Sequence, residues 1–83
     1  MGYWVYILRC KDDSLYTGIT TDLPRRVEEH NAGTGAKYTR GRGPVVLVYR
    51  ESISDRSSAS KREAEIKKLS RGEKLRLISS YQN

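Results

Sequence analysis

The sequence has few of the residues that mark secreted, membrane-spanning or cysteine-ligated proteins. Its single cysteine, Cys10, excludes an internal disulfide and cannot form a cysteine-based zinc site by itself. No stretch approaches the ~20 apolar residues that a membrane helix needs. Residues 1–4 lack the basic segment and the small-residue cleavage site of a signal peptide. These absences predict a cytoplasmic protein that does not associate with a membrane.

Phenylalanine is absent, whereas six of the 83 residues are tyrosine. A core that needed only aromatic area would include phenylalanine, because a buried tyrosine hydroxyl requires a hydrogen-bonding partner. Tyr6 and Tyr16 lie in segments expected to be strands, and Tyr38 lies in a loop. We therefore treat these phenols as candidate site groups. The alternative for each is an amphipathic position at the edge of the core.

Basic residues outnumber acidic ones, with sixteen Lys and Arg against ten Asp and Glu and a formal net charge of +6. A basic field attracts polyanions, so it favours a nucleic acid or an anionic surface as partner. A charge that serves only solubility is the alternative. Residues 33–43 concentrate four glycines with Lys37, Arg40 and Arg42, which predicts an irregular basic loop.

Hydrophobic periodicity and turn residues predict one domain, residues 1–83, with six secondary-structure elements. Strands are expected at residues 3–10, 15–20 and 44–50, and helices at residues 22–31, from about 57 to 69, and from 70 onward. The third helix should begin with a Ser-x-x-Glu capping box at Ser70 and dock through Leu75 and Ile78. The order β-β-α-β-α-α implies an α/β fold of the α+β kind, a three-stranded sheet flanked by helices.

The hairpin formed by the first two strands decides whether Tyr6 and Tyr16 share a face. Side chains alternate along a strand, and residues opposite each other in a hairpin have a constant index sum. Both tyrosines have even numbers, so they share a face only if the loop has an odd length or a bulge intervenes. A two-residue loop at residues 12–13 would put them on opposite faces. Gly18, in mid-strand, indicates a bulge or the close approach of another group.

Three polar residues stand at positions that need an explanation. Glu63 falls on the apolar stripe of the second helix, and an inward carboxylate needs a cation, a hydrogen-bond network or a metal. If it is unpaired without metal, alanine there should be neutral or stabilising. The alternative is a glutamate that reaches water or pairs with a nearby arginine. Arg26 and His30 are four residues apart on the first helix, where they suit phosphate binding and proton movement, or simply form its solvated edge.

Together these groups match the needs of phosphodiester hydrolysis. That reaction requires a carboxylate to hold a metal, a cation for the developing negative charge and a base for the attacking water. Glu63, Arg26 and a Tyr/His pair supply this set. No cluster of Asp and Glu is available for two metals, so a one-metal mechanism is expected.

Short motifs spread over the chain resemble those of the GIY-YIG nuclease superfamily. The first two are Val5-Tyr6-Ile7 and Tyr16-Thr17-Gly18, followed by residues 23–26, 30–31, 37–39, 62–63 and 66–67. The resemblance covers about residues 3–79 and is greatest to small stand-alone bacterial members. Two departures are the missing first glycine, with Trp4-Val5 in its place, and Thr17 in the middle of the second motif. Neither removes a catalytic group.

The resemblance implies a central three-stranded antiparallel sheet and one divalent metal ion, Mg²⁺ or Mn²⁺, held by Glu63. It implies that Arg26 binds the scissile phosphate. Family members differ over which tyrosine is the general base. We expect Tyr6, activated by His30, with Tyr16 orienting water or phosphate. The expected catalytic residues are Tyr6, Tyr16, Arg26, His30 and Glu63, and the expected DNA contacts are Gly18, Lys37, Tyr38, Arg40, Arg42 and Lys67.

The leading hypothesis is therefore a metal-dependent DNA endonuclease, selective for structure or damage, that acts in repair or recombination. DNA contacts should be made mainly to backbone phosphates. The alternative is a nucleic-acid-binding module that has little activity of its own or needs a partner subunit. A purely structural interaction protein would leave the five catalytic candidates unexplained. The oligomeric state is not predicted.

Overall fold

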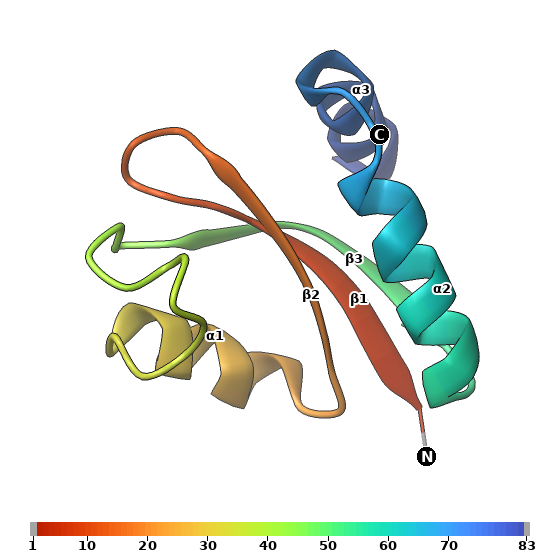
Figure 1. Ribbon diagram of the computed structural model, residues 1–83, viewed down its shortest axis with the longest axis horizontal. Coiled ribbons are helices and arrows are strands. Elements are labelled where there is room, and N and C mark those ends of the chain that lie inside the picture. Colours follow the sequence, from red (N-terminus) through yellow and green to blue (C-terminus); the bar gives the residue numbers. More distant parts are fainter. Residues whose placement is uncertain (1, 83) are drawn as a thin grey trace.

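The computed structural model describes residues 2–82. Three strands and three helices follow in the predicted order, β-β-α-β-α-α (Figure 1). They are β1 (Tyr3–Arg9), β2 (Leu15–Thr20), α1 (Leu23–Asn31), β3 (Val46–Ile53), α2 (Arg56–Lys67) and α3 (Arg71–Gln82). None of the helices within this part of the chain is long and apolar enough to cross a membrane.

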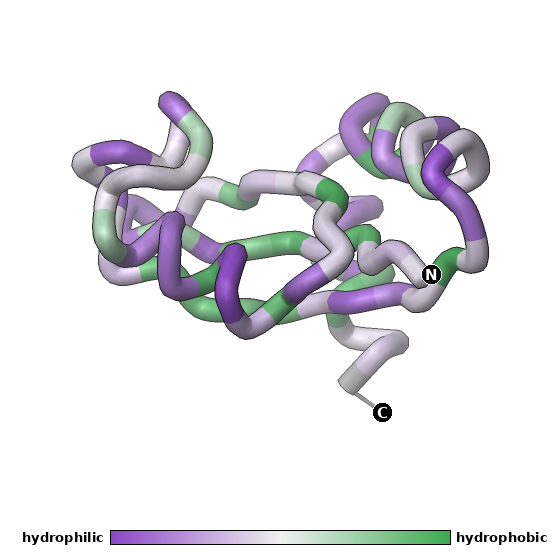
Figure 2. The backbone as a smooth tube through the Cα atoms, turned by 90° about the horizontal axis from the view of Figure 1, so that it is seen from below, coloured by the Kyte–Doolittle hydropathy of each residue, from purple (hydrophilic) through white to green (hydrophobic). Residues whose placement is uncertain are grey.

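The sheet is antiparallel with the strand order β2-β1-β3, so the first strand is central, as its apolar character on both faces predicted. Figure 1 shows α1 on one side of the sheet and α2 with α3 on the other. Val5 and Ile7 of β1 pack with α2, whereas Tyr6 and Leu8 pack toward Leu23 of α1. Figure 2 shows the hydrophobic stretches gathered in the central strands, with hydrophilic ones at the periphery.

The hairpin has the register that a shared tyrosine face requires. Tyr6 lies opposite Gly18 and Leu8 lies opposite Tyr16, so the index sum is even and both tyrosines face α1. The connection spans the five residues 10–14, an odd length, because β1 ends at Arg9. The Cys10 N–H donates to the Ser14 carbonyl over 2.8 Å, and Asp13 adopts the left-handed conformation with φ 71°. The prediction about Tyr6 and Tyr16 is confirmed.

Helix starts follow the capping signals in the sequence. The Asp22 carboxylate accepts from the backbone N–H of Arg25 over 3.2 Å, which caps α1. At α3, the Ser70 N–H donates to the Glu73 carboxylate over 2.9 Å, and the Glu73 N–H donates to Ser70 Oγ over 3.2 Å. The predicted capping box is therefore present.

Two predictions are wrong, namely the limits of the third strand, expected at residues 44–50, and the docking of α3 through Leu75. The third strand begins at Val46 because the Asn31 side chain bonds both backbone groups of Val45, with Val45 N–H to Oδ1 at 2.7 Å and Nδ2 to the Val45 carbonyl at 3.4 Å. It continues to Ile53, which pairs with Tyr3. Leu75 does not dock α3, since its side chain is exposed; packing against β3 selects the stripe that contains Leu77 and Ile78.

Candidate active site

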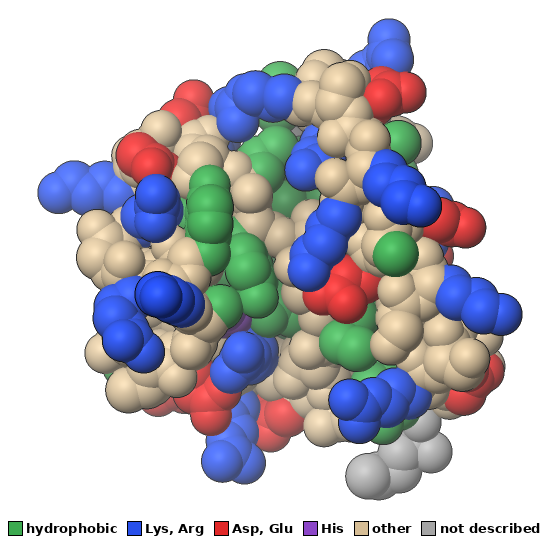
Figure 3. All heavy atoms as spheres, viewed as in Figure 1, with side chains coloured by type: hydrophobic (Ala, Val, Ile, Leu, Met, Phe, Trp, Pro, Cys, Tyr) green, Lys and Arg blue, Asp and Glu red, His purple; other side chains and the backbone are tan. Residues whose placement is uncertain are grey.

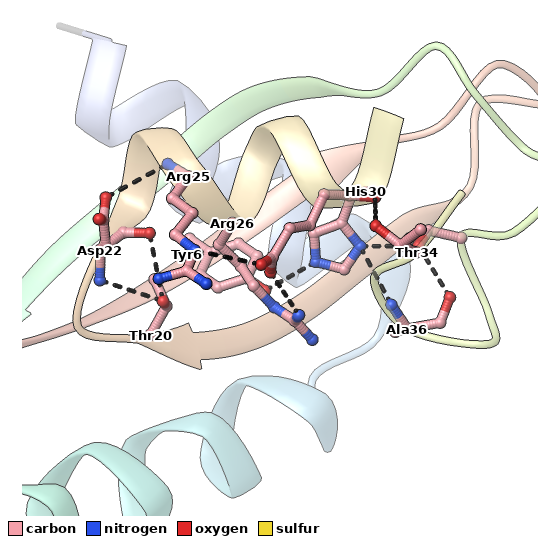
Figure 4. Close-up of polar contacts among 10 residues, drawn as sticks. Tyr6, Thr20, Asp22, Arg25, Arg26, His30, Thr34 and Ala36 are labelled. Carbon is pink, nitrogen blue, oxygen red and sulfur yellow. Dashed lines mark hydrogen bonds and ion pairs between the residues drawn. The ribbon is translucent and has the colours of Figure 1, made fainter. Parts of the chain in front are cut away.

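A buried hydrogen bond between a phenol and an imidazole forms the centre of the site. β1 directs Tyr6 toward α1, whose last turn carries His30. The Tyr6 hydroxyl lies 2.9 Å from His30 Nε2, and both residues are 1% exposed. Figure 4 shows the two side chains pointing toward one another from the sheet and the helix. The two strongest members of the predicted catalytic set are thus in direct contact.

The surroundings keep both groups neutral near pH 7. Burial raises the pKa of Tyr6 to about 12; the Tyr16 phenol and the Glu63 carboxylate act in the same direction, and the adjacent Arg26 guanidinium opposes them. Burial also lowers the pKa of His30, assisted by Arg26 and opposed by Glu29. A protonated phenol therefore faces an imidazole that is able to accept its proton.

Tyr16 and Tyr38 extend this pair into an aromatic cluster. The Tyr16 ring centroid lies 5.2 Å from that of His30 and 6.5 Å from that of Tyr6. Tyr38 stacks on Tyr16 at 5.9 Å with an interplanar angle of 25°, and the Arg42 guanidinium covers Tyr38 at 4.4 Å. Tyr16 is half-buried, so its phenol is the more accessible of the two strand tyrosines.

Gly18 admits both tyrosine rings to this cluster. A Cβ atom at this position would lie 2.7 Å from the Tyr6 hydroxyl oxygen, 2.8 Å from Tyr6 Cζ and 3.2 Å from Tyr16 Cε2. The close approach that the mid-strand glycine indicated is therefore made by Tyr6. Gly18 is itself buried, so its place in the structure is one of packing, and the DNA contact predicted for it stays untested.

Gly18→Ala should lower the free energy of unfolding by about 1–3 kcal/mol, because the new methyl group overlaps a buried ring. Gly72→Ala is the matched control, since a Cβ there meets nothing within 4 Å and the residue lies in the first turn of α3. That control should be neutral or slightly stabilising. Urea denaturation measures both, and equal stabilities for the two variants would contradict this account of Gly18.

Arg26 lies beside Tyr6 and is held by Glu29. Its Nη1 donates to Glu29 Oε1 over 2.9 Å, and Arg25 pairs with the other Glu29 oxygen at 3.3 Å. Both Arg25 and Arg26 line a pocket that continues to Thr20 and to Arg56 at the start of α2. The guanidinium has five donors, so the Glu29 contact leaves others for an anion. The phosphate-binding role predicted for Arg26 stays a prediction.

Glu63 lies on α2, which packs on the other face of the sheet and contacts both β2 and β1. Its carboxylate pairs with Lys67 at 3.2 Å, and its side chain is 22% exposed. The cation that an inward carboxylate needs is therefore Lys67, four residues on, so the expectation of an unpaired charge is wrong. Lys67 was predicted as a DNA contact, and in this structure its ammonium group is engaged by Glu63.

The donor set around Glu63 bears on the expected metal. Among residues 2–82, no three His, Cys, Asp or Glu side chains come together as a metal cluster. Mg²⁺ is often held by one or two carboxylates while water and substrate phosphate complete its shell. A single, partly exposed carboxylate whose charge acts on the Tyr6 phenol fits that manner of binding. Glu63 could therefore hold one ion in this manner, and the predicted Mg²⁺ or Mn²⁺ stays a prediction.

The basic loop, residues 33–43, is folded onto the site by short turns and side-chain contacts. Lys37, Tyr38 and Arg40 are exposed, which leaves them accessible to a partner. Arg42 is half-buried: its Nε donates to Asp12 Oδ2 over 3.1 Å and its Nη1 to the Tyr38 carbonyl over 2.7 Å, which ties the loop to the hairpin. The DNA contact predicted for Arg42 stays a prediction.

Four further residues that sequence reasoning did not select shape the site. Thr39 hydrogen-bonds His30, Gly35 lets the loop close over that ring, Glu29 holds Arg26, and Arg56 lines the pocket beside it. Only Glu29 had a local signal, namely its i,i+3 and i,i+4 spacing to Arg26 and Arg25. The other three depend on how the loop and α2 meet α1.

Basic side chains surround the candidate site on the outer surface. Figure 3 shows Lys and Arg along both sides of a hollow, with hydrophobic side chains and a few acidic ones exposed between. The arrangement combines a phenol with a proton acceptor, a cation beside the phenol, a carboxylate on α2 whose charge acts on that phenol, and a positively charged rim. That combination suits reactions at a phosphate group.

The chain is similar in sequence to known proteins over nearly its whole length. The GIY-YIG catalytic domain model matches residues 2–76. A UPF0213 protein of Clostridium perfringens is 61% identical over 77 residues, covering 93% of this chain and 83% of that protein. A UPF0213 protein of Haloquadratum walsbyi is 60% identical over 75 residues, covering 90% and 84%.

Solved structures agree with the fold. The solution NMR structure of a UPF0213 protein from Bacillus halodurans is 52% identical, with a TM-score of 0.62 over 95% of this chain and 84% of that one. The solution NMR structure of a protein from E. faecalis is 43% identical, with a TM-score of 0.67 over 99% and 88%.

Proposed function

The chain belongs to the GIY-YIG catalytic domain family, a nuclease superfamily, and from this premise we propose that it is a metal-dependent endonuclease that hydrolyses phosphodiester bonds in DNA. The observation that carries the proposal is the buried contact between the Tyr6 hydroxyl and His30 Nε2 beside Arg26. Repair or recombination is the proposed setting.

Tyr6 is proposed as the general base and His30 as the acceptor of its proton. Burial raises the pKa of Tyr6 to about 12 and lowers the pKa of His30, so the phenol does not give up its proton to His30 unaided. The favourable course is concerted: the Tyr6 proton passes to His30 Nε2 while Tyr6 takes a proton from the attacking water. The water oxygen then bonds to phosphorus, and the bond to the leaving deoxyribose oxygen breaks.

Arg26 and Tyr16 position the phosphate in this proposal. Arg26 contributes donors to its non-bridging oxygens, in exchange for part of its contact with Glu29. Tyr16, with the more accessible phenol, orients the water or the phosphate. Glu63 would hold one Mg²⁺ or Mn²⁺ ion, which supplies Lewis-acid stabilisation of the charge that develops on the phosphate.

DNA is proposed to approach along the basic rim, through backbone phosphates. If about four phosphates are neutralised, the slope of log affinity against log salt should be roughly −3 to −4. Lys37→Ala combined with Arg40→Ala should reduce the size of that slope by about 2. Lys61→Ala, on the outward side of α2, is the control and should leave it unchanged. Fluorescence anisotropy over a salt series measures this, and a salt-independent affinity would contradict backbone binding.

The activity is tested with supercoiled plasmid and with a branched oligonucleotide duplex, each in Mg²⁺, in Mn²⁺ and in EDTA. Nicked circles or cut strands in the two metals, and intact DNA in EDTA, are the expected result. Tight binding without cleavage in either metal would instead favour a nucleic-acid-binding module that needs a partner subunit. A protein that neither binds nor cleaves DNA under these conditions would overturn the proposal.

A further inference from the structure

The loop that covers His30 makes a contact with the far side of its ring. Thr39 is 1% exposed, and its Oγ1 lies 2.7 Å from His30 Nδ1. The same hydroxyl donates to the Ala36 carbonyl over 3.0 Å. Three hydrogen bonds thus form a chain from the Tyr6 hydroxyl through both ring nitrogens of His30 to Thr39 and Ala36.

The direction of this chain follows from the Tyr6 hydroxyl. Among residues 2–82 its hydrogen bond is to His30 Nε2, and the Arg26 guanidinium beside it can only donate, so the phenol hydrogen goes to Nε2 and the neutral ring carries its proton on Nδ1. Thr39 Oγ1 then accepts from Nδ1, and its single hydrogen goes to the Ala36 carbonyl. In the reverse tautomer Thr39 would donate to Nδ1, and the Ala36 carbonyl would keep the Thr39 N–H, at 3.2 Å, as its donor.

One contact favours the reverse tautomer. The Ala36 N–H points toward His30 Nδ1 with a nitrogen–nitrogen distance of 3.5 Å. That distance is at the long limit of a hydrogen bond, whereas the Thr39 contact, at 2.7 Å, is short. The Thr39 contact fits either tautomer, so the choice rests on the Tyr6 hydroxyl, whose hydrogen needs Nε2 as its acceptor.

The fold of the loop depends on this closure. A Cβ atom on Gly35 would lie 2.6 Å from His30 Nδ1 and 2.9 Å from its Cα, so only glycine lets the loop approach the ring. Figure 4 shows Ala36 beside His30, on the side of the ring away from Tyr6. The glycine-rich loop therefore contacts the buried His30 ring, in addition to carrying exposed basic side chains.

We propose that Thr39 is a positioning residue that holds His30 as the Nδ1–H tautomer and so makes Nε2 the proton acceptor for Tyr6. The effect of Thr39 on turnover rests on the proposed nuclease function, whereas its effect on the His30 tautomer does not. When Nε2 takes the Tyr6 proton, the Nδ1–H group of the resulting imidazolium keeps Thr39 Oγ1 as its acceptor. Thr39 thus accommodates both protonation states without moving.

The tautomer is measurable directly, because His30 is the only histidine in the chain. Long-range ¹H–¹⁵N spectra of ¹⁵N-histidine-labelled protein at pH 7.5, without DNA or metal, report the protonation of each ring nitrogen. The expected wild-type spectrum has a protonated Nδ1 and an unprotonated Nε2. A wild-type protein with the proton on Nε2 would overturn the proposal, whatever the variants do.

Two substitutions separate the hydroxyl from the shape of the residue. Thr39→Val removes the hydroxyl at nearly equal volume and should shift the ring toward the Nε2–H form or a mixture. Thr39→Ser retains the hydroxyl and should keep the wild-type spectrum. A Thr39→Val spectrum identical to wild type, in a variant shown by circular dichroism to be folded, would also overturn the assignment.

Cleavage gives the second readout. Thr39→Val should lower kcat by about 10- to 100-fold, the range found for residues that orient an active-site group, with little change in KM. Thr39→Ser should restore most of the rate. If the wild-type protein cleaves no DNA, the proposed function fails while the NMR result still decides the role of Thr39. If it cleaves and Thr39→Val cleaves equally well, the positioning role is wrong.

Discussion

Glu63→Ala should abolish metal-dependent cleavage and leave the fold intact. Loss of the carboxylate removes several kcal/mol of charge stabilisation by the ion, so turnover should fall by about 10³-fold or more. Stability should change little, because the substitution breaks one partly exposed helical pair with Lys67, worth about 0.3–0.5 kcal/mol. The measurements are single-turnover cleavage and thermal unfolding with and without Mg²⁺. The variant should lose any stabilisation by Mg²⁺.

The matched control is Glu65→Ala, two residues along the same helix. Glu65 pairs with Arg62 at 3.1 Å and its side chain is 66% exposed, so it also loses one ion pair but has no place in the site. Its cleavage rate and its response to Mg²⁺ should equal those of the wild type. Unaltered cleavage by Glu63→Ala would end the claim that this residue is the metal ligand.

Tyr6→Phe should lower the cleavage rate by about 10²- to 10⁴-fold, the usual contribution of general acid–base catalysis. It should also lower the free energy of unfolding by about 1–3 kcal/mol, since His30 Nε2 loses its buried partner. Single-turnover kinetics at saturating protein measures the first effect, and urea denaturation the second. DNA affinity should be unchanged, because Tyr6 is buried and carries no charge.

Tyr49→Phe is the control for Tyr6→Phe. Tyr49 is also buried in the sheet, and its hydroxyl donates to Glu51 Oε1 over 2.7 Å, but it lies on the α2 side and away from His30. It should lose stability and keep the cleavage rate. Tyr16→Phe then assigns the base: a smaller loss than in Tyr6→Phe supports Tyr6, and a larger loss would transfer the role to Tyr16.

Local signals in the sequence predicted most of the fold. Caps at Asp22 and Ser70 fixed the starts of two helices, and the parity of Tyr6 and Tyr16 fixed the face that they share. The limits of β3 could not be predicted in this way. They depend on the Asn31 side chain, fourteen residues away, which occupies the backbone of Val45. The docking face of α3 likewise depends on β3, not on the helix alone.

The site residues likewise fall into those with a local signal in the sequence and those that depend on contacts made in the folded chain. Tyr6, Arg26 and His30 carried signals in residue type and spacing, and the structure brings them together. Thr39 lay in a segment that resembles the family motifs, but its contact with His30 could not be predicted, because that contact exists only once the loop has closed. The pairing of Glu63 with Lys67 could have been predicted from their i,i+4 spacing. The DNA contact predicted for Lys67 stays a prediction, since its side chain is 54% exposed beside Glu63.

Whether cleavage belongs to this site is the central question, and one comparison tests it. Wild type, Glu63→Ala, Tyr6→Phe and the two controls are purified identically, and single-turnover cleavage of one branched duplex is followed in Mg²⁺. We expect wild type, Glu65→Ala and Tyr49→Phe to cleave at similar rates, while Glu63→Ala and Tyr6→Phe are slower by at least about 10²-fold. Equal rates in all five preparations would contradict this expectation.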